Sequence, residues 1–537
     1  MLNSPELDAI LISDSGIDTL SGTNPLKLHV EGRVGAVQII SNYIKNKGRI
    51  SDPVTGDNQF SWSSAPKLNG LFLYSFLARN NIRIGLIHNY RNQREYFSKL
   101  LDQRPKAVII STTFIFFKHT LRELTADIRS LDPNIFIIAG GPFVYYSSLL
   151  LKKSHQQKYE TDAAAKDFLF LEVEDEPDID LYIVSPRGEK TLLTVLNSLT
   201  GGRVPASIPE TARLEGNSFS FTQRTGTMVV PVGNMEIDWQ MLPQSIFETG
   251  VIPIQASNGC PYNCSFCNFT KDRRLSFVKP LDCLISELRS VEKRGIKYVW
   301  FVDDNFRMGR NDLDKVSRRF IKNDIGVKWM CFIRAGALKN ISMDLLQKAG
   351  CMEVQIGLES GDAQILENMN KQADPAMYVE VIGKVLRQGI NVSCYFISGF
   401  PGETEETAAT TRQFIRSIEN PDVPGSLSWS IYPFLLTPLS PIYEPEMRQK
   451  YALHGYMSNW SHHTMDYRQA KKLVLKAFME LENSGPIYRE DNLEDLARLT
   501  PAGKKKFFRV RHQLAKKSLQ EQLTQEDISR SFKEILE

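Results

Sequence analysis

Short apolar segments alternate with amphipathic segments in two separate series along this chain. In the first series the apolar segments have the length of β-strands, and they cover residues 7–13, 82–88, 106–112, 134–140 and 179–185. The segments between them, such as LNGLFLYSFLARN and LRELTADIRSLD, repeat apolar residues at helical spacing. Strands that alternate with helices in this way predict an α/β fold, which begins here with an N-terminal doubly wound, Rossmann-like parallel sheet.

The second series contains six strand-like segments, which are again separated by helical patterns such as LDCLISELRSVEKRG. They cover residues 251–257, 297–304, 327–335, 352–360, 390–400 and 426–436. Six successive strand–helix units predict a central partial (β/α)6 barrel. In barrels of this kind the active-site residues follow the carboxyl ends of the strands.

The remaining segments divide the chain further. Residues 201–245 are rich in Gly, Pro, Ser and Thr, which predicts a linker with one hairpin. After residue 440 the sequence becomes helical and strongly charged, notably at 467–485 and from about residue 500. We therefore expect a doubly wound domain at 1–200, a linker at 201–245, a partial barrel at 246–440 and a mainly helical C-terminal extension at 441–537.

The composition is that of an ordinary globular protein, with 42% apolar and 24% charged residues. The chain has no run of the roughly 18 uncharged apolar residues that a membrane span needs, and MLNSPELDAILIS has acidic residues where a signal peptide needs basic ones. We expect a cytoplasmic protein without a membrane partner. The net charge of +3 gives no sign of nucleic-acid binding, and we interpret the basic run at 503–517 as one solvated helical face.

Polar and glycine-rich segments follow three strands of the predicted doubly wound sheet, namely SDSG, STTF and AGGPF. Ligands of such sheets bind outside the carboxyl ends of the strands, so Ser111, Thr112, Gly140 and Gly141 are candidate binding residues. The glycine pair would let a bulky ligand approach the backbone, although it could also do no more than turn the chain. No GxGxxG motif follows the first strand, which disfavours a dinucleotide.

Three of the seven cysteines stand close together in CPYNCSFC. Cys260, Cys264 and Cys267 would supply three thiolates from one loop, one fewer than a closed tetrahedral zinc site or a fully ligated four-iron cluster requires. The missing ligand favours a cluster with one iron open to an external molecule. Zinc with a distant fourth ligand is the alternative, but no second Cys or His pair accompanies the loop. The other cysteines, Cys283, Cys331, Cys351 and Cys394, are scattered over the barrel segments.

With this motif the chain resembles the radical S-adenosylmethionine (SAM) superfamily. The resemblance implies that Cys260, Cys264 and Cys267 bind a 4Fe-4S cluster whose open iron is chelated by the amino and carboxylate groups of SAM. It also implies that Phe266, just before the last cysteine, lies beside the adenine. Arg334 ends the third strand segment of the barrel, where we expect it to pair with the SAM carboxylate.

Three further motifs resemble SAM-binding segments of the same superfamily. FVDDNF implies that Asp303 and Asp304 receive the methionine ammonium, which needs a carboxylate or carbonyl acceptor. GLESGD is similar to a ribose-binding motif, so Glu359 and Ser360 are expected to bond the sugar hydroxyls. ISGFPGET resembles the segment whose backbone flanks the adenine, here at Gly399.

The order of the domains, with a linker that ends in IDWQMLP, resembles the cobalamin (B12)-binding branch of this superfamily. The resemblance implies that STTF and AGGPF contact the nucleotide tail of cobalamin. The DxHxxG loop that gives many cobalamin proteins an axial histidine is absent, because SDSGID at 13–18 has no His. We therefore expect cobalamin to bind without a protein imidazole, with His29, His88 and His119 in packing or surface roles. A helical pattern at 32–50 is additional and could reshape the pocket or cover the barrel.

The function that the resemblance implies is cobalamin-dependent methyl transfer to an unactivated carbon, or to phosphorus, in a small specialised metabolite. The implied partners are that small molecule and an external one-electron donor of the flavodoxin or ferredoxin type. Two alternatives stay open. One is a radical SAM enzyme that oxidises, cyclises or rearranges its substrate without methyl transfer, and the other is a non-catalytic metal or partner-binding protein.

One C-terminal segment, NWSHHTMDYRQA, contains candidate chemistry of its own. His462 and His463 could contact substrate, because a neutral imidazole both donates and accepts hydrogen bonds. The structural alternative, which we favour, is the start of a helix with Thr464 or Ser461 as its N-cap.

Overall fold

The structure is a computed structural model of the whole chain. It describes residues 7–16, 29–30, 33–34, 60, 62–156, 158–202, 207–223, 236–268, 276–309, 312–489, 491–521, 523–524, 526–527 and 530–531. These residues form two compact units. The first unit takes its residues from 1–21 and 66–243, and the second takes its residues from 22–65 and 244–537.

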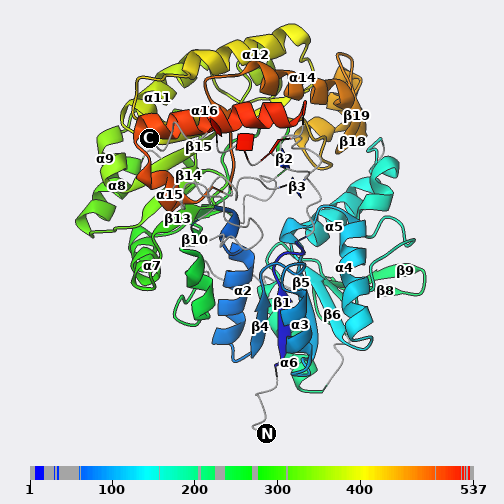
Figure 1. Cartoon of the computed structure of the whole chain (residues 1–537). Helices are drawn as coiled ribbons and strands as arrows, with labels where there is room; N and C mark the ends of the chain where they lie inside the picture. Colours follow the sequence, from blue (N-terminus) through cyan, green and yellow to red (C-terminus); the bar gives the residue numbers. More distant parts are fainter. Residues whose placement is uncertain are drawn as a thin grey trace. The chain divides into compact units, whose positions relative to one another are not determined.

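The first unit is built on a seven-stranded sheet with the order β4-β1-β5-β6-β7-β8-β9 (Figure 1). The strands are β1 (Ala9–Ile12), β4 (Ile84–Ile87), β5 (Ala107–Ser111), β6 (Phe136–Gly140), β7 (Leu181–Ile183), β8 (Thr211–Glu215) and β9 (Ser218–Phe221). The first five in chain order pair in parallel, which confirms the five predicted strands. Because β4 lies on one side of β1 and β5 on the other, the order reverses between β1 and β5, where ligands of such sheets bind.

Five helices accompany this sheet, and two of them, α2 and α4, cover the two helical patterns quoted from the sequence. They are α2 (Leu68–Arg79), α3 (Arg94–Leu101), α4 (Lys118–Leu131), α5 (Pro142–Ser154) and α6 (Glu189–Thr200). The hairpin expected within 201–245 is present as β8 and β9. It is antiparallel and continues the sheet beyond β7 instead of standing apart from it.

The second unit contains a seven-stranded parallel sheet whose strands follow one another in chain order. The strands are β10 (Val251–Ile254), β13 (Tyr298–Phe301), β14 (Lys328–Phe332), β15 (Cys351–Glu359), β16 (Asn391–Ser398), β17 (Leu427–Pro433) and β20 (Gly485–Pro486). The first six are the predicted barrel strands. No pairing between β10 and β20 closes the sheet in the described part of the chain, so the barrel is a partial one.

Helices cover the outer side of this sheet (Figure 1). They are α7 (Leu281–Lys293), α8 (Leu313–Lys322), α9 (Met343–Lys348), α10 (Ala363–Asn368), α11 (Pro375–Arg387) and α12 (Glu405–Ile418). Side-chain caps fix where several of them begin, since Ser342, Asp362, Asp374 and Thr404 each accept a hydrogen bond from a backbone N–H of the first turn. These caps hold the loops that follow the strands in place.

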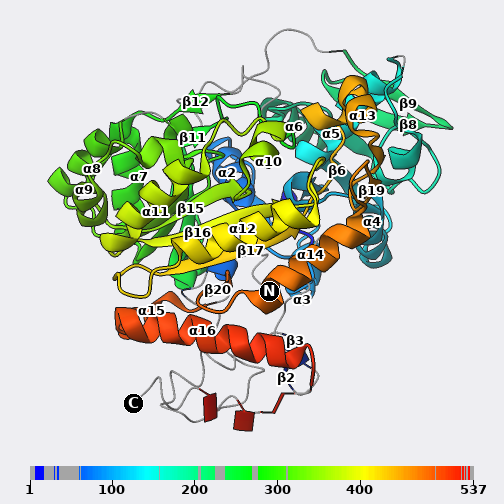
Figure 2. The ribbon, with the colours of Figure 1, turned by 90° about the horizontal axis from the view of Figure 1, so that it is seen from above.

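The C-terminal segment is mainly helical, as predicted. It contains α13 (Pro445–Tyr451), the hairpin of β18 (His454–Tyr456) and β19 (Asn459–Ser461), α14 (Tyr467–Glu480), α15 (Leu493–Arg498) and α16 (Pro501–Ser518). Figure 2 shows α16 alongside β20, and Gly485 lies against the Phe508 carbonyl. The predicted N-cap of α14 is wrong. Asp466 caps this helix, because its carboxylate reaches the Gln469 N–H and the Gln469 side chain bonds back to the Asp466 N–H.

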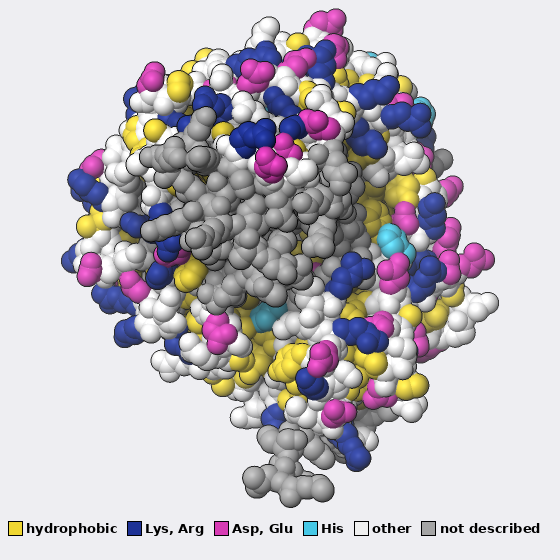
Figure 3. Space-filling model, viewed as in Figure 1, with side chains coloured by type: hydrophobic (Ala, Val, Ile, Leu, Met, Phe, Trp, Pro, Cys, Tyr) yellow, Lys and Arg dark blue, Asp and Glu magenta, His cyan; other side chains and the backbone are white. Residues whose placement is uncertain are grey.

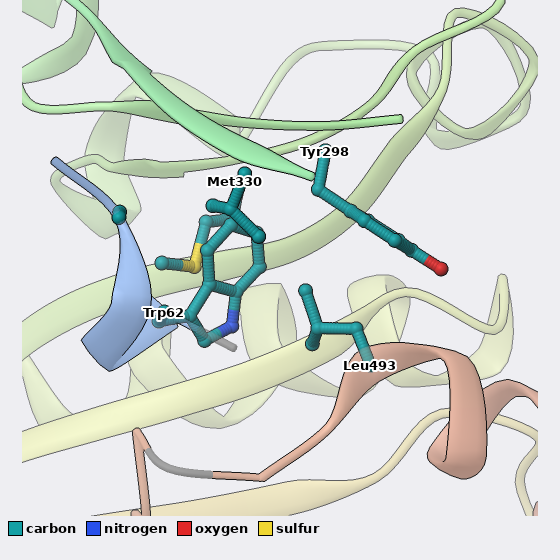
Figure 4. Packing of buried hydrophobic residues seen from close by; sticks show 6 residues of the cluster. Trp62, Tyr298, Met330 and Leu493 are labelled. Atoms are coloured by element: carbon teal, nitrogen blue, oxygen red, sulfur yellow. The ribbon is translucent and has the colours of Figure 1, made fainter. Parts of the chain in front are cut away.

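A hydrophobic cluster closes the amino ends of the second sheet (Figure 4). Trp62 packs against Tyr298 of β13, Met330 of β14 and Leu493 of α15. The cluster therefore joins a segment from early in the chain to strands β10, β13 and β14 and to the C-terminal segment.

The predicted helical segment at 32–50 lies outside the described residues except for Arg33–Val34, which forms β3 and pairs with β2 (His29–Val30). Where residues are described, no helix is both long enough and apolar enough to cross a bilayer. In Figure 3, Lys and Arg side chains are interspersed with Asp and Glu, so the visible described surface has no patch of a single charge.

Candidate active site

The three motif cysteines lie in the connection between two short antiparallel strands, β11 (Ser257–Asn258) and β12 (Phe277–Val278), directly after β10. Gly259 begins this loop with a φ of +94°, and a Cβ atom there would lie 2.4 Å from Ser276 Oγ. Only glycine suits such a turn. The structure thus fixes the loop at its start by backbone conformation.

The thiols of this loop differ in their surroundings. Cys264 is buried, whereas Cys260 and Cys267 are half-buried. No disulfide joins any of the seven cysteines, all of which are described. Burial raises the pKa of the Cys260 thiol, and a backbone hydrogen bond at Tyr262 and the charge of Arg334 oppose the rise. No three Cys, His, Asp or Glu residues of the described chain converge as a group that could hold one metal ion. A four-iron cluster does not require such convergence, since each thiolate binds a different iron.

Hydrogen bonds from two other parts of the second unit hold the cysteine loop. Ser265 N–H donates to the Met369 carbonyl at 2.8 Å, and Asn370 Nδ2 donates to the Asn263 carbonyl at 2.8 Å. On the other flank Ile442 N–H donates to the Ser265 carbonyl at 2.8 Å. The middle of the loop is therefore fixed between the segment after α10 and the segment after β17.

Arg334, at the end of β14, reaches this loop. Its guanidinium carbon lies 3.7 Å from the centre of the Tyr262 ring, and its Nη1 lies 3.3 Å from Cys264 Sγ. Nη2 donates to the Lys371 carbonyl, and the backbone N–H donates to Asn305 Oδ1. Arg334 thus joins the cysteine loop to the end of β13 and to the segment after α10.

The two acids after β13 take different positions. Asp303 is 2% exposed, and its carboxylate accepts from Ala256 N–H at 2.7 Å, Ser257 Oγ at 2.6 Å and Arg307 N–H at 3.0 Å. Burial raises the pKa of Asp303 to about 6 against these hydrogen bonds. Asp304 is exposed, and one of its oxygens accepts from the Gly259 N–H at 2.8 Å. Asp303 thus supports the start of the cysteine loop, whereas Asp304 also faces solvent.

Glu359 ends β15 in the left-handed region, with a φ of +66° at a register shift against β16. Its carboxylate accepts from Lys371 Nζ at 2.7 Å, and both side chains are buried. Lys371 Nζ also lies 5.9 Å from the centre of the Phe266 ring. Gly357 leaves the room for this pair, because a Cβ atom there would lie 2.3 Å from Glu359 Oε1. The pair places the predicted ribose-binding acid next to the predicted adenine-stacking ring.

Ser360 has a mainly structural environment. Its hydroxyl lies 3.1 Å from Thr411 Oγ1 and accepts from the Asp362 N–H at 3.1 Å. These contacts shape the turn between β15 and α10. Glu359 is therefore better placed than Ser360 to contact a ligand at this strand end.

Gly399 lies in the turn after β16 with a φ of +88°, and it is tightly enclosed. A Cβ atom there would lie 2.5 Å from Ala470 Cβ, and the Gly399 carbonyl accepts from His462 Nε2 at 3.0 Å. His462 also stacks on Trp460, and burial lowers its pKa to about 4, so it is a neutral donor to this turn. His463 Nδ1 is bonded to the Tyr451 carbonyl. Both histidines thus bond backbone carbonyls, and the helix that follows them is capped by Asp466.

The predicted ligand residues of the first unit gather at the point where its strand order reverses. Asn69 of α2 donates to the Ser13 carbonyl at 2.9 Å and to Ser111 Oγ at 2.7 Å, and Thr112 Oγ1 donates to the Gly140 carbonyl. Asn69 Oδ1 is buried without a partner among the described residues. This unpaired acceptor indicates that a ligand group or water completes the edge.

Two details of the same edge bear on a bulky ligand. Gly141 has a φ of +114°, a conformation that strains any side chain, and a Cβ atom there would lie 3.1 Å from Thr112 Oγ1. His88 follows β4, and neither of its buried ring nitrogens has a partner in the described chain. Burial lowers the pKa of His88 to about 4, which keeps it neutral. His119 is exposed, and the side chain of His29 is outside the described residues.

Three residues of this region were not predicted from the sequence. Lys371 pairs with Glu359, and Asn305 joins Arg334 while its Nδ2 is buried without a partner among the described residues. Glu403 is buried and accepts from the Gly399 N–H and from Ser398 Oγ. Burial raises the pKa of Glu403 to about 7. Asn305 and Glu403 lie within quoted motifs, but their roles depend on tertiary contacts that no spacing reveals.

Comparison with known proteins gives one family match and several proteins of similar sequence. Residues 254–415 match the radical SAM superfamily. Over 331 residues the chain is 23% identical to an uncharacterised methyltransferase of Pyrococcus horikoshii, covering 60% of this chain and 66% of that protein. It is 32% identical over 179 residues to bacteriochlorophyllide d C-12(1)-methyltransferase of Chlorobaculum tepidum, covering 31% and 37%. It is 26% identical over 339 residues to the anaerobic magnesium-protoporphyrin IX monomethyl ester cyclase of Cereibacter sphaeroides, covering 59% and 54%. The chain thus spans 37% to 66% of the length of these curated relatives.

Two solved structures share the fold. The cobalamin-dependent SAM radical enzyme OxsB with aqua-cobalamin bound aligns with a TM-score of 0.56 at 13% identity, over 99% of this chain and 84% of that one. The radical SAM methyltransferase TsrM from Kitasatospora setae, with cobalamin and a [4Fe-4S] cluster bound, aligns with a TM-score of 0.51 at 15% identity, over 81% and 74%. At these sequence identities, the similarity to both structures is a similarity of fold alone.

Proposed function

Residues 254–415 match the radical SAM superfamily, and from that premise we propose that this chain is a cobalamin-dependent radical SAM methyltransferase of a small molecule. The observation that carries the proposal is the cysteine loop. Three thiols without disulfides are held at the carboxyl end of a parallel sheet, with a fixed guanidinium beside the central sulfur. The fold likeness to OxsB and TsrM supports the cobalamin part.

The cofactors supply the reactive chemistry when they are bound: the cluster and SAM generate a radical that takes hydrogen from the substrate, and cobalamin carries the methyl group. Cys260, Cys264 and Cys267 would hold the cluster. Arg334 would hold Cys264 in place, because its Nη1 lies 3.3 Å from the Cys264 sulfur.

The residues around the loop would bind SAM. Asp304 keeps an exposed oxygen that can accept from the methionine ammonium, while Asp303 fixes the backbone at the start of the loop. Glu359 and the Phe266 ring flank Lys371, so they can receive the ribose and the adenine together. Gly399 would present its enclosed backbone to the adenine. Arg334 already bonds the cysteine loop and has further donors for the SAM carboxylate.

The first unit would bind cobalamin at its carboxyl edge. Ser111, Thr112, Gly140 and Gly141 would contact it there, and a side chain at Gly141 would be strained. The unpaired Asn69 Oδ1 is an acceptor for an amide or hydroxyl of the cofactor. The substrate would be a small molecule, and the electron would come from an external donor of the flavodoxin or ferredoxin type.

Anaerobic purification with cluster reconstitution tests the proposal. We expect optical bands of an iron–sulfur cluster and of a corrinoid. With a low-potential reductant we expect SAM to give 5'-deoxyadenosine, and with substrate also S-adenosylhomocysteine and a product heavier by one CH₂ unit. A protein that forms the cluster but cleaves no SAM would contradict the proposal.

A second function is favoured by the similarity to the Cereibacter sphaeroides cyclase. That alignment covers 339 residues, whereas the alignment with the Chlorobaculum tepidum methyltransferase covers 179. In that case the same cluster and SAM site would oxidise, cyclise or rearrange the substrate without methyl transfer. The product mass separates the two functions, because only methylation adds a CH₂ unit.

A further inference from the structure

The turn between β16 and α12 is enclosed by residues of the C-terminal segment. A Cβ atom on Gly399 would lie 2.5 Å from Ala470 Cβ and 2.8 Å from Trp460 Cη2, and both of these residues are buried. Ala470 belongs to α14, which lies beside α12 in Figure 2, and Trp460 belongs to β19. The space left for this turn is therefore set by a part of the chain that follows all six predicted barrel strands.

Two side chains hold the two peptide groups that flank Gly399. The Gly399 N–H donates to the Glu403 carboxylate, and the Gly399 carbonyl accepts from His462 Nε2 at 3.0 Å. Gly399 has a φ of +88°, and a glycine rotates about its backbone bonds with little steric restriction. The peptide group between Gly399 and Phe400 thus depends on His462 for its orientation.

The donor role of His462 follows from its partners. A carbonyl oxygen only accepts hydrogen bonds, so Nε2 must carry the hydrogen. In a neutral ring Nδ1 is then an acceptor, and it lies 3.1 Å from Thr464 Oγ1 and 3.4 Å from the Thr464 backbone nitrogen, both of which can donate to it. A charged ring would set an Nδ1–H against the Thr464 N–H. The contacts therefore select a neutral imidazole with its hydrogen on Nε2.

The imidazole is held in place by its own part of the chain. It stacks on the Trp460 ring with 5.0 Å between the ring centres and 8° between the planes. The His462 N–H donates to the Met465 carbonyl at 2.9 Å, and the residue is buried. The position of the Nε2 donor is therefore set by residues 460–465, and the turn at Gly399 is held against it.

The same residues also hold the end of the neighbouring strand. Trp460 Nε1 donates to the carbonyl of Phe434, the residue after β17, at 2.7 Å. The Phe434 N–H donates to the Ser398 carbonyl at 2.7 Å, and the Phe434 and Phe400 ring centres are 5.1 Å apart. The ends of β16 and β17 and the turn at Gly399 thus form one packed group, to which His462 adds a directional bond.

We propose that His462 is a positioning residue of the SAM site: its bond to the Gly399 carbonyl fixes the turn that flanks the adenine in the conformation that binds SAM. The inference rests on the proposed function, which takes the adenine to lie against this turn. It goes further because it gives the C-terminal segment a part in SAM binding, through a residue that acts on the backbone of the turn.

Removal of this bond should weaken SAM binding without abolishing it. A turn that holds its binding conformation for only part of the time lowers the apparent SAM affinity by that fraction. The loss of one neutral hydrogen bond changes such an equilibrium by about fivefold. We therefore expect SAM to bind about fivefold more weakly when the donor is lost.

Two substitutions at His462 separate the hydrogen bond from the packing of the ring. His462→Phe keeps a flat ring on Trp460 but has no donor, so it should show the full fivefold loss, to within about a factor of two. His462→Gln loses the stacked ring but offers an amide N–H, so its SAM affinity should stay within about twofold of the unsubstituted chain. A side chain that only fills space would rank the two variants in the opposite order.

The measurement is calorimetric titration of SAM into the anaerobic full chain with its cluster reconstituted, without substrate and without reductant. His463→Phe is the matched control. The His463 ring also bonds a backbone carbonyl, that of Tyr451 at the end of α13, and stacks on the Tyr451 ring. This variant should bind SAM as tightly as the unsubstituted chain. Denaturant unfolding of each variant shows whether it is folded.

Equal SAM affinity in His462→Phe and in the unsubstituted chain would overturn the positioning role. So would an affinity of His462→Gln as low as that of His462→Phe, or an equal loss in His463→Phe. If His462→Phe does not fold, Thr464→Val decides, because it removes the hydroxyl that holds Nδ1 as the acceptor. It should bind SAM at least about twofold more weakly, and an unchanged affinity would overturn the proposal.

The outcomes also separate this inference from the proposed function. An unsubstituted chain that binds no SAM would overturn both. A chain whose variants rank as expected but that transfers no methyl group would keep the positioning role of His462 and lose the proposed reaction.

Discussion

The Arg334 guanidinium contacts two parts of the second unit at once. It stacks on Tyr262, donates to Cys264 Sγ and donates to the Lys371 carbonyl, so it ties the cysteine loop to the segment that carries the partner of Glu359. A planar cation with several donors is suited to this task, and lysine would not replace it. The loop of the motif cysteines is thus held by side chains as well as by the backbone.

The triple variant Cys260→Ala, Cys264→Ala and Cys267→Ala should lose the absorption and spin signals of the 4Fe-4S cluster and all SAM cleavage. Iron has no other thiolate in this loop to bind. Cys283→Ala, on α7, is the matched control and should retain both. Iron content, optical spectra and a 5'-deoxyadenosine assay measure the effect. A full cluster in the triple variant would show that the ligands lie elsewhere.

The two acids after β13 should respond differently to the same substitution. Asp304→Asn loses the charge that would receive the SAM ammonium, so we expect SAM to bind about tenfold more weakly with little change in stability. Asp303→Asn places an amide against the Ala256 and Arg307 N–H groups, so we expect a loss of roughly 1–3 kcal/mol in unfolding free energy.

Calorimetric SAM binding and denaturant unfolding separate these two effects. The sequence led us to expect a SAM-binding role for both acids, and the contacts of Asp303 now favour support of the loop. Equal loss of SAM affinity in both variants, with unchanged stability, would return Asp303 to the ligand-binding group.

Among the elements, the turn from β16 to α12 contains the titratable group with the clearest linkage to stability. Glu403 is buried and accepts from the Gly399 N–H, and burial raises its pKa to about 7 from the 4.5 of an ordinary glutamate. The folded chain therefore binds this proton more tightly than the unfolded chain. The stability that Glu403 contributes is fully present below pH 4.5 and is lost as the pH rises through 7.

Glu403→Gln should remove this dependence, because an amide does not ionise. Relative to the unsubstituted protein, the variant should gain up to about 3 kcal/mol in unfolding free energy between pH 5 and pH 8. Glu380→Gln, on the exposed side of α11, should show no such gain. Urea unfolding at several pH values measures both, and a gain of the opposite sign would mean that Glu403 is ionised in the folded state at low pH.

The strands were predictable because each is a short apolar run between turn residues, and all eleven predicted runs form strands. The hairpin of β8 and β9 was expected, but its place in the first sheet was not, since β9 reads SFSF and has no long apolar run. β20 is only Gly485–Pro486 and has no periodicity at all. The Asp466 cap was missed because the neighbouring Thr464 and Ser461 are equally good capping residues by type.

Within the site, sequence reasoning located the residues that follow strands directly. Cys260, Asp304 and Glu359 belong to motifs whose position at a strand end was visible from the pattern. Lys371 was not visible, because it follows a helix and reaches Glu359 only through the fold. Buried partners such as Lys371 depend on tertiary contacts, which spacing along the chain does not encode.

For the whole molecule, the cobalamin proposal has a spectroscopic consequence. We expect the cob(II)alamin form to lack the superhyperfine splitting of a coordinated protein nitrogen, because the loop after β1 offers no histidine. His88 is the one described histidine of the first unit that is neutral, buried and unpartnered at the carboxyl edge. Electron paramagnetic resonance of the full chain and of His88→Ala decides the point. Splitting that disappears in the variant would identify His88 as an axial ligand.

The chain passes twice between its two compact units before residue 70, and this limits how it can be divided. Phe60 and Trp62 belong to the second unit, where Leu493 N–H donates to the Phe60 carbonyl and Trp62 fills the hydrophobic cluster. A fragment that begins near residue 244 would keep the cysteine loop yet lack the indole that covers Tyr298 and Met330. The second unit is consequently not one continuous stretch of sequence, because Trp62 of its core is translated before the whole 66–243 segment of the first unit.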